Sequence, residues 1–240
     1  MEFIHTQRPM LRVAINGFGR IGRTVLKAGF DRPDVEFVAV NDLTEPKILA
    51  HLLQYDSTFR TWGHTVSADG QNLVIDGKVV KVVAEMDPAK LPWKELGIDV
   101  VIESTGRFTD MTGAGKHLEA GARKVVISAP AKEVPTFLMG VNHRQAKKTH
   151  TVVNNASCTT NSIAPVAQIM QETFGVAKAM MTTVHSVTAE QNIVDGLPPK
   201  LHPDMRRARA ALTNIVPTST GAAKAVAEAL PEFKGKFDGI

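Results

Sequence analysis

The only cysteine of this chain, Cys158, has the surroundings of a nucleophile. It stands where an extended apolar run, Thr151–Val153, gives way to a helical pattern with apolar side chains on one face. A thiol at the start of a helix lies near the positive end of the helix dipole and near free backbone N–H groups, and both favour the reactive thiolate. His185 ends a strand-like segment, Met181–His185, and is the candidate partner that holds or takes a proton. Because a free cysteine is more often a small unreactive core residue, this pair alone leaves both interpretations open.

A second candidate site begins near the N-terminus, where a strand-like run, Leu11–Asn16, precedes a glycine motif. The motif is Gly17-Phe18-Gly19-Arg20-Ile21-Gly22 and opens a helical pattern. In a G-x-G-x-x-G motif the first glycine permits the tight turn, the second lets a pyrophosphate approach the backbone, and the third lets the helix pack on the strand. The pyrophosphate then lies on the helix N-terminus. The sequence therefore predicts dinucleotide binding by Gly17, Phe18, Gly19, Arg20 and Ile21.

Asp42 is the candidate for choosing between the two common dinucleotides. It follows the next strand-like run, Val35–Val40, and lies about 20 residues beyond Gly22, as expected for the ribose-binding acid. A carboxylate at this point accepts hydrogen bonds from the adenosine ribose and repels a 2′-phosphate, which favours NAD over NADP. An Asn-Asp pair after a strand is also a common solvated turn, but the spacing favours the ribose role.

Strand-like and helix-like segments alternate from Leu11 to about Ser157. Two of the strands, Ile98–Glu103 and Lys124–Ser128, are nearly all apolar, as in a parallel sheet buried on both faces. This alternation predicts an α/β fold with a doubly wound, mostly parallel sheet of the Rossmann type. Asp69-Gly70 and Asp76-Gly77 are turn-forming pairs next to runs in which apolar and polar residues alternate. This pattern predicts a small β-hairpin.

Composition narrows the class of protein. One cysteine cannot form an intramolecular disulfide, which favours a reducing cytoplasm. Residues 1–10 lack the apolar core of a signal peptide, and no run approaches the ~20 apolar residues that a membrane span needs. The net charge of +4 is modest and dispersed, which gives little support for nucleic acid and suits a protein that binds phosphorylated small molecules.

Several motifs occur in one order and together resemble phosphorylating glyceraldehyde-3-phosphate dehydrogenase from Arg12 to the last residue. They are Asn16-Gly17-Phe18-Gly19-Arg20-Ile21-Gly22-Arg23, Glu103-Ser104-Thr105-Gly106, Ile127-Ser128-Ala129-Pro130, Ser157-Cys158-Thr159-Thr160-Asn161, Thr183-Val184-His185, Arg206-Arg207-Ala208-Arg209-Ala210 and Ser219-Thr220-Gly221-Ala222-Ala223-Lys224. The resemblance implies a two-domain enzyme that uses NAD and no metal. It would oxidise an aldehyde phosphate and capture the acyl group with inorganic phosphate.

The resemblance also assigns roles to residues at matching positions. Cys158 and His185 are implied to be catalytic, and Ser128 joins the NAD-binding residues named above. The implied substrate-binding residues are Ser157, Thr159, Thr188, Arg207, Thr220 and Gly221.

Some of these positions also have an ordinary structural interpretation. Arg206, Arg207 and Arg209 could form a solvated basic face, and we choose Arg207 as the phosphate contact and Arg209 as structural. Thr220 precedes an Ala-rich helical run, where it could cap the helix, bind an anion, or do both. Thr188 could be an ordinary loop hydroxyl.

The family pattern normally continues beyond Ile240, so we interpret this chain as a fragment. We expect a leader at residues 1–10, an NAD-binding Rossmann domain over 11–157, and an incomplete α+β catalytic domain over 158–240. The long polar segment Ser186–Thr213 is implied to line a neighbouring subunit's pocket in a homotetramer, and it is slightly longer than usual around Pro199–Pro203.

Three functions remain open at this point. The favoured one is NAD-dependent oxidative phosphorylation of glyceraldehyde 3-phosphate to 1,3-bisphosphoglycerate through a thioester on Cys158. An erythrose-4-phosphate dehydrogenase would share the cofactor and the Cys–His pair but release the acid to water. A catalytically incomplete nucleotide-binding fragment is the third.

Overall fold

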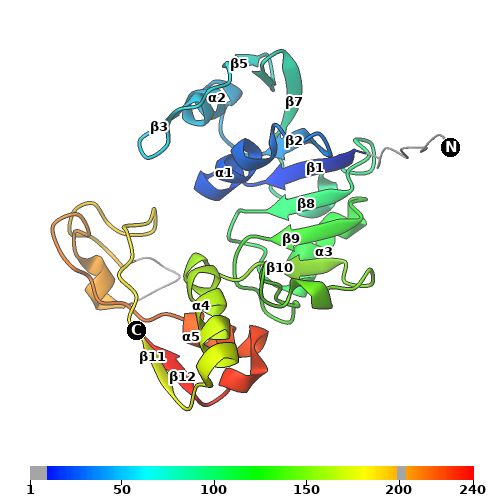
Figure 1. The fold of residues 1–240 in the computed structure, drawn as a ribbon. Helices are drawn as coiled ribbons and strands as arrows, with labels where there is room; N and C mark the ends of the chain where they lie inside the picture. Colours follow the sequence, from blue (N-terminus) through cyan, green and yellow to red (C-terminus); the bar gives the residue numbers. More distant parts are fainter. Residues whose placement is uncertain (1–9, 199–203) are drawn as a thin grey trace. The chain divides into compact units, whose positions relative to one another are not determined.

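The computed structural model describes residues 10–198 and 204–240, which form two compact units (Figure 1). The first holds the residues up to Phe137 with Arg144–Ala156, and the second holds Leu138–His143 with Ser157–Ile240. The expected leader, apart from Met10, and the longer loop at Pro199–Pro203 lie outside the described residues. The domain boundary between residues 157 and 158 stays a prediction.

The first unit is built on an eight-stranded sheet with the order β10-β9-β8-β1-β2-β7-β6-β5. Its strands are β1 (Leu11–Asn16), β2 (Val35–Asn41), β5 (Val66–Asp69), β6 (Asn72–Ile75), β7 (Lys78–Val83), β8 (Val100–Glu103), β9 (Lys124–Ile127) and β10 (Val152–Asn154). Neighbours from β10 to β7 are parallel, whereas β5, β6 and β7 form the expected antiparallel hairpins. The chain runs from β1 outward to β2 and later returns to β8 on the other side of β1, so the strand order reverses between β1 and β8. The predicted doubly wound α/β sheet is confirmed.

Helices cover both faces of this sheet, which is why the middle of its central strand β1, Val13–Ile15, is apolar. They are α1 (Arg20–Gly29), α2 (Pro46–Gln54) and α3 (Met111–Glu119), and smaller elements are β3 (Tyr55–Asp56), β4 (Arg60–Thr61), η1 (Pro88–Lys90) and η2 (His143–Gln145). Val13 and Ile15 of β1 pack with Leu26 of α1 in one core cluster. Ala14, between them, packs with Trp93 in a second cluster. Successive side chains of a strand point to opposite faces, so both faces of β1 are buried.

The second unit pairs two helices with a small parallel sheet. Its elements are α4 (Cys158–Phe174), β11 (Ala179–Met181), η3 (Met205–Ala208), α5 (Ala222–Ala229), η4 (Pro231–Phe233) and β12 (Phe237–Gly239), with β11 beside β12. The predicted helix start at Cys158 is confirmed. Pro165 lies inside α4, where it has no N–H to donate to the preceding turn.

The strand predicted over Met181–His185 is wrong for most of its length. β11 spans only Ala179–Met181, and Met181 is paired with Gly239 of β12. Beyond that point Thr183 donates its backbone N–H to the Ile240 carbonyl at 2.8 Å. His185 therefore lies on the segment that follows the strand. Across residues 10–198 and 204–240, no helix has both the length and the apolar composition needed to cross a membrane.

Candidate active site and cofactor pocket

Cys158 is the first residue of helix α4, and the serine before it caps that helix. The Ser157 hydroxyl accepts the Thr160 backbone N–H at 3.0 Å, which satisfies one of the N–H groups that a helix start leaves without a helical partner. The first turn of α4 holds no acidic side chain, so nothing there opposes the positive end of the helix dipole. The sequence therefore places the thiol where backbone N–H groups and the dipole favour its anion.

The imidazole of His185 faces this thiol. Its Nε2 lies 3.2 Å from Cys158 Sγ, and its Nδ1 lies 2.7 Å from the Ser186 carbonyl oxygen. A carbonyl oxygen only accepts, so Nδ1 carries the hydrogen and Nε2 is turned toward the sulfur. Both side chains are exposed, so a substrate can reach them.

The two groups shift each other's protonation toward an ion pair. Partial burial acts to raise the pKa of the Cys158 thiol, but the hydrogen bond and charge of His185, helped by the N–H and hydroxyl of Thr159, lower it below its ordinary value. The Ser186 carbonyl and then the Cys158 sulfur raise the pKa of His185 above its ordinary value. Both shifts act in the same direction, since each favours the thiolate of Cys158 and the imidazolium of His185 over the neutral pair.

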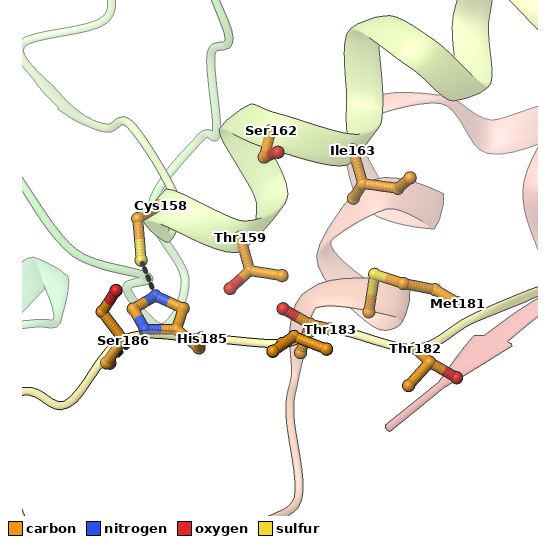
Figure 2. A pocket seen from close by; sticks show the side chains of 10 residues that line it. Cys158, Thr159, Ser162, Ile163, Met181, Thr182, Thr183, His185 and Ser186 are labelled. Carbon is orange, nitrogen blue, oxygen red and sulfur yellow. Dashed lines mark hydrogen bonds between the residues drawn. The ribbon is translucent and has the colours of Figure 1, made fainter. Parts of the chain in front are cut away.

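A cavity of about 480 Å³ lies beside the pair (Figure 2). It is lined by Cys158, Thr159, Ser162, Ile163, Met181, Thr182, Thr183, Val184, His185 and Ser186, which come from α4 and from the segment after β11. The lining mixes hydroxyl groups with apolar side chains such as Ile163 and Met181. Of the predicted site residues, this cavity brings together Cys158, Thr159 and His185.

The remaining predicted substrate residues do not line that cavity. Ser157 is occupied as the cap of α4, and the Thr188 backbone N–H donates to the Gln191 side chain at 2.9 Å. Thr220 Oγ1 accepts the Ala222 N–H at 3.1 Å, so it is engaged at the start of α5, and Gly221 is the N-cap residue of that helix.

The three arginines differ in their partners. Arg206 pairs with Asp204 at 2.6 Å and Arg209 pairs with Asp195 at 2.5 Å, which agrees with a structural role for Arg209. Within the described part of the chain, Arg207 has no carboxylate at ion-pair distance. Arg207 therefore keeps its guanidinium available for an anion.

In the first unit, the glycine motif behaves as its spacing predicts. Gly17 has φ +91°, and a Cβ there would lie 2.7 Å from the backbone carbon of Ser104. A Cβ on Gly22 would lie 2.2 Å from the Gly17 oxygen, so α1 packs on β1 only without a side chain at that position. A Cβ on Gly19 would meet nothing within 4 Å, so open space lies before the start of α1. A pyrophosphate fits such a space.

A cavity of about 300 Å³ lies at the carboxyl ends of the parallel strands, where doubly wound sheets bind their ligands. Its lining residues are Asn16, Gly17, Gly19, Asn41, Asp42, Leu43, Glu85, Met86, Ser104, Thr105, Arg107 and Phe108. Gly17, Gly19 and Asp42 are thus together, as predicted. Asp42 Oδ2 accepts the Phe18 N–H at 2.8 Å and Oδ1 accepts the Thr44 N–H at 3.0 Å. An ionised carboxylate has about four acceptor sites, so lone pairs remain for ribose hydroxyls, and the residues present fit NAD.

The other predicted cofactor residues lie outside the lining of this cavity. The Phe18 side chain is buried, and Ile21 is exposed on α1. Arg20 pairs with Asp56 at 2.5 Å. The Ser128 hydroxyl donates to Ser104 Oγ at 3.1 Å and so contacts a lining residue.

Sequence reasoning missed several lining residues as site residues. Glu85 and Met86 follow β7, whereas Thr105, Arg107 and Phe108 follow β8. The available signal was their place: they come directly after the carboxyl ends of parallel strands, on either side of β1 and β2.

Comparison with known proteins covers both units. Residues 11–111 match the family model described as "Glyceraldehyde 3-phosphate dehydrogenase, NAD binding domain", and residues 157–240 match "Glyceraldehyde 3-phosphate dehydrogenase, C-terminal domain". The chain is 57% identical over 232 residues to the glyceraldehyde-3-phosphate dehydrogenase of Geobacillus stearothermophilus, covering 96% of this chain and 68% of that protein. This chain belongs to the glyceraldehyde-3-phosphate dehydrogenase family. Glyceraldehyde-3-phosphate dehydrogenase 1 of Bacillus subtilis (strain 168) is also 57% identical, over 231 residues, covering 95% of this chain and 68% of that protein.

Membership of the glyceraldehyde-3-phosphate dehydrogenase family confirms three predictions. The family resemblance is right, NAD is the cofactor of the first unit, and the chain is an NAD-dependent oxidoreductase. The two family models match separate parts of the chain, one ending at residue 111 and the other beginning at residue 157. In the described residues, no group of three or more His, Cys, Asp or Glu side chains is arranged to hold a metal ion.

Proposed function

We propose that this chain catalyses the NAD-dependent oxidative phosphorylation of glyceraldehyde 3-phosphate to 1,3-bisphosphoglycerate. The observation that carries the proposal is the 3.2 Å contact between Cys158 Sγ and His185 Nε2 at the start of a helix, in a chain of this family. The names of the two relatives give the aldehyde, and the Cys–His pair supplies the chemistry that its oxidation needs.

The Cys158 thiolate attacks the aldehyde carbon, so that a C–S bond forms and the carbonyl electron pair moves to oxygen. The Cys158 backbone N–H and the protonated His185 are the donors for that developing oxyanion. Protonation by His185 gives a hemithioacetal and leaves a neutral imidazole, which is the base for the next step.

NAD, held by the glycine motif and Asp42, would supply the acceptor for the hydride of the former aldehyde carbon. As the hydride leaves, His185 removes the hydroxyl proton of the hemithioacetal, and a thioester remains on Cys158. Inorganic phosphate then attacks the thioester carbon, the C–S bond breaks, and the thiolate is released. A low thiol pKa assists this last step because a stable thiolate is a good leaving group.

Hydroxyls, N–H groups and one cation are proposed to hold the two phosphate groups. Thr159 lines the cavity beside the nucleophile, and Arg207 has a guanidinium without a described carboxylate partner. The other proposed phosphate ligands are Ser157, Thr188, Thr220 and Gly221. Gly221 precedes α5, where free N–H groups suit an anion.

For the cofactor, we propose that the backbone of Gly17–Ile21 and Ser128 hold NAD and that Asp42 selects it over NADP. The open space at Gly19 and the two remaining acceptor sites of Asp42 support this assignment. We further propose a homotetramer in a reducing cytoplasm, with domains over 11–157 and 158–240. Exposed apolar side chains on the segment after His185, such as Val194 and Leu197, support subunit contact.

The test is NADH formation from glyceraldehyde 3-phosphate with and without inorganic phosphate. We expect sustained turnover only with phosphate. Turnover that does not depend on inorganic phosphate would favour the erythrose-4-phosphate dehydrogenase type of reaction, in which water takes the acyl group. A nucleotide-binding fragment would give no burst of NADH per Cys158 with excess aldehyde.

A further inference from the structure

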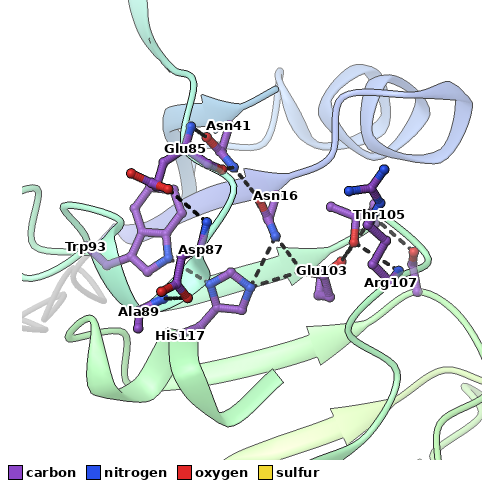
Figure 3. Close-up of polar contacts among 12 residues, drawn as sticks. Asn16, Asn41, Glu85, Asp87, Ala89, Trp93, Glu103, Thr105, Arg107 and His117 are labelled. Carbon is purple, nitrogen blue, oxygen red and sulfur yellow. Dashed lines mark hydrogen bonds and ion pairs between the residues drawn. The ribbon is translucent and has the colours of Figure 1, made fainter. Parts of the chain in front are cut away.

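A buried polar network lies behind the cofactor cavity, and the proposed mechanism does not use it (Figure 3). At its centre is Glu103, the last residue of β8, whose side chain has no solvent exposure. Its carboxylate accepts from Asn16 Nδ2 (2.5 Å), His117 Nε2 (3.0 Å), the Thr105 backbone N–H (2.8 Å) and the Thr105 hydroxyl. The two carboxylate oxygens of Glu103 thus accept from groups of three different residues.

The network joins the ends of four neighbouring strands. Asn41, at the end of β2, donates to Asn16 Oδ1 at 2.6 Å and is itself held by the backbone N–H and carbonyl of Glu85. Asn16, at the end of β1, then donates to Glu103. The strand order β7-β2-β1-β8 is thus linked from side to side at the edge where the cavity lies.

Three of the four neighbours of Glu103 can only donate to it: the Thr105 backbone N–H, His117 Nε2 and the Asn16 amide. The indole N–H of Trp93 only donates, and it lies 2.9 Å from His117 Nδ1, so Nδ1 accepts and Nε2 carries the hydrogen that faces Glu103. The Glu85 backbone fixes Asn41, and Asn41 in turn fixes the amide of Asn16 with its NH₂ group toward Glu103.

We propose that Glu103 is a positioning residue for NAD: it holds the Thr105–Arg107 turn in the conformation that binds the dinucleotide, without touching it. Thr105 and Arg107 line the cavity, whereas Glu103 does not. The Thr105 hydroxyl also accepts the Arg107 N–H at 3.1 Å, so the hold on Thr105 extends to Arg107. This inference rests on NAD binding by the first unit.

Glu103→Gln separates the contacts to Asn16 and His117 from the contacts to Thr105. Because Asn16 and His117 are locked as donors, the amide oxygen of Gln must face them, and its NH₂ group then faces Thr105. The Thr105 hydroxyl can rotate to accept, but the Thr105 backbone N–H meets a donor and loses its partner. The turn is released while the rest of the network stays satisfied. If the turn then spends a tenth of its time in the binding conformation, the Kd for NAD rises about tenfold.

Electrostatics alone predicts that Glu103→Gln binds NAD more tightly, which is the opposite of the effect expected from lost positioning. NAD carries an anionic pyrophosphate, so removing a nearby carboxylate charge would tighten its binding. Weaker binding by Glu103→Gln is therefore a signature of lost positioning.

The experiment measures the Kd for NAD by titration calorimetry, the melting temperature, and hydrogen exchange of the Thr105 amide. Ile75→Val is the matched control, because Ile75 is fully buried in β6 and lies outside the cavity lining. We expect Glu103→Gln to weaken NAD about tenfold and to speed exchange at Thr105. Ile75→Val should have a lower melting temperature and an unchanged Kd for NAD. Glu103→Asp keeps the carboxylate on a side chain that is one methylene shorter, so it should weaken NAD binding less than Glu103→Gln does. If Glu103→Gln does not fold, Glu103→Asp is the variant on which the inference is tested.

Unchanged or tighter NAD binding by Glu103→Gln would overturn the inference, as would an equal loss in Ile75→Val. Greater loss in Glu103→Asp than in Glu103→Gln would also overturn it. If the unaltered chain failed to bind NAD, the proposed function itself would fall, so the two failures are distinguishable.

Discussion

His185→Asn is the substitution that most directly tests the pairing of the two proposed catalytic side chains. In the structure, Nε2 of His185 lies 3.2 Å from Cys158 Sγ, and this contact both lowers the pKa of the thiol and raises the pKa of the imidazole. A hydrogen bond to a charged group contributes about 1.5–3 kcal/mol. Both side chains are exposed, so solvent screening argues for the lower end of that range. A loss of about 1.5 kcal/mol corresponds to roughly tenfold less thiolate at neutral pH.

The assay is the rate of Cys158 alkylation by iodoacetamide across pH, followed in parallel with NADH formation. The unaltered chain should keep a high alkylation rate as pH falls, until the lowered thiol pKa is reached. In His185→Asn the midpoint should move to higher pH, with roughly tenfold slower alkylation at neutral pH. Turnover should fall further, by about 10²–10⁴-fold, because the base is lost as well.

Ser162→Ala is a suitable control, because Ser162 lines the same cavity and is not among the groups that shift the thiol pKa. It should leave the alkylation profile unchanged. An identical profile for His185→Asn and the unaltered chain would show that thiol and imidazole are not paired in solution, and the proposed mechanism would lose its base.

Three further predictions concern single side chains. Cys158→Ser should abolish NADH formation, because a hydroxyl forms no useful anion near neutral pH, while its NAD affinity should stay within a few-fold of that of the unaltered chain. A loss of turnover smaller than about tenfold would exclude Cys158 as the nucleophile. Asp42→Ala should weaken NAD and narrow the NAD/NADP preference in competition titrations, and an unchanged preference would place the selection elsewhere. The hydrogen bond to Asp76 raises the pKa of His64, so its contribution to stability is complete below the unfolded pKa of about 6.5 and is lost as pH rises through the higher folded pKa. The melting-temperature difference between the unaltered chain and His64→Gln should therefore shrink from pH 6 to pH 9, and a constant difference would contradict this.

The features predicted correctly from sequence were those set by short-range chemistry. Apolar runs placed β1 and β2, and the glycine spacing placed Gly17, Gly19 and Gly22 where a side chain would clash or block an approach. The start of α4 at Cys158 followed from the change of an extended apolar run to a helical pattern. These signals lie within a few residues of one another, so one sequence is enough to read them.

The features that sequence missed depend on residues far apart in the chain. His185 was expected on a strand, but β11 stops at Met181, and its partner β12 is distant in the sequence, so no local pattern shows how far the pairing extends. Glu103, His117 and Trp93 meet only because β8, α3 and the segment before β8 fold together. A single acidic residue in an apolar strand was the available signal for that network, since such a residue is buried only with partners.

The proposed selection of the dinucleotide and the proposed recognition of its pyrophosphate are coupled through one carboxylate. Asp42 accepts the Phe18 N–H at 2.8 Å, and Phe18 lies between the two glycines that shape the phosphate-binding turn. The same side chain therefore fixes the turn, and in the proposed site its remaining lone pairs bind the ribose. Deleting it removes a ribose acceptor and also leaves a turn N–H without its partner, so affinity and selectivity change together. This coupling explains why an acid suits the position after β2: it lies beside the glycine turn, because β1 and β2 are parallel and end at the same edge of the sheet.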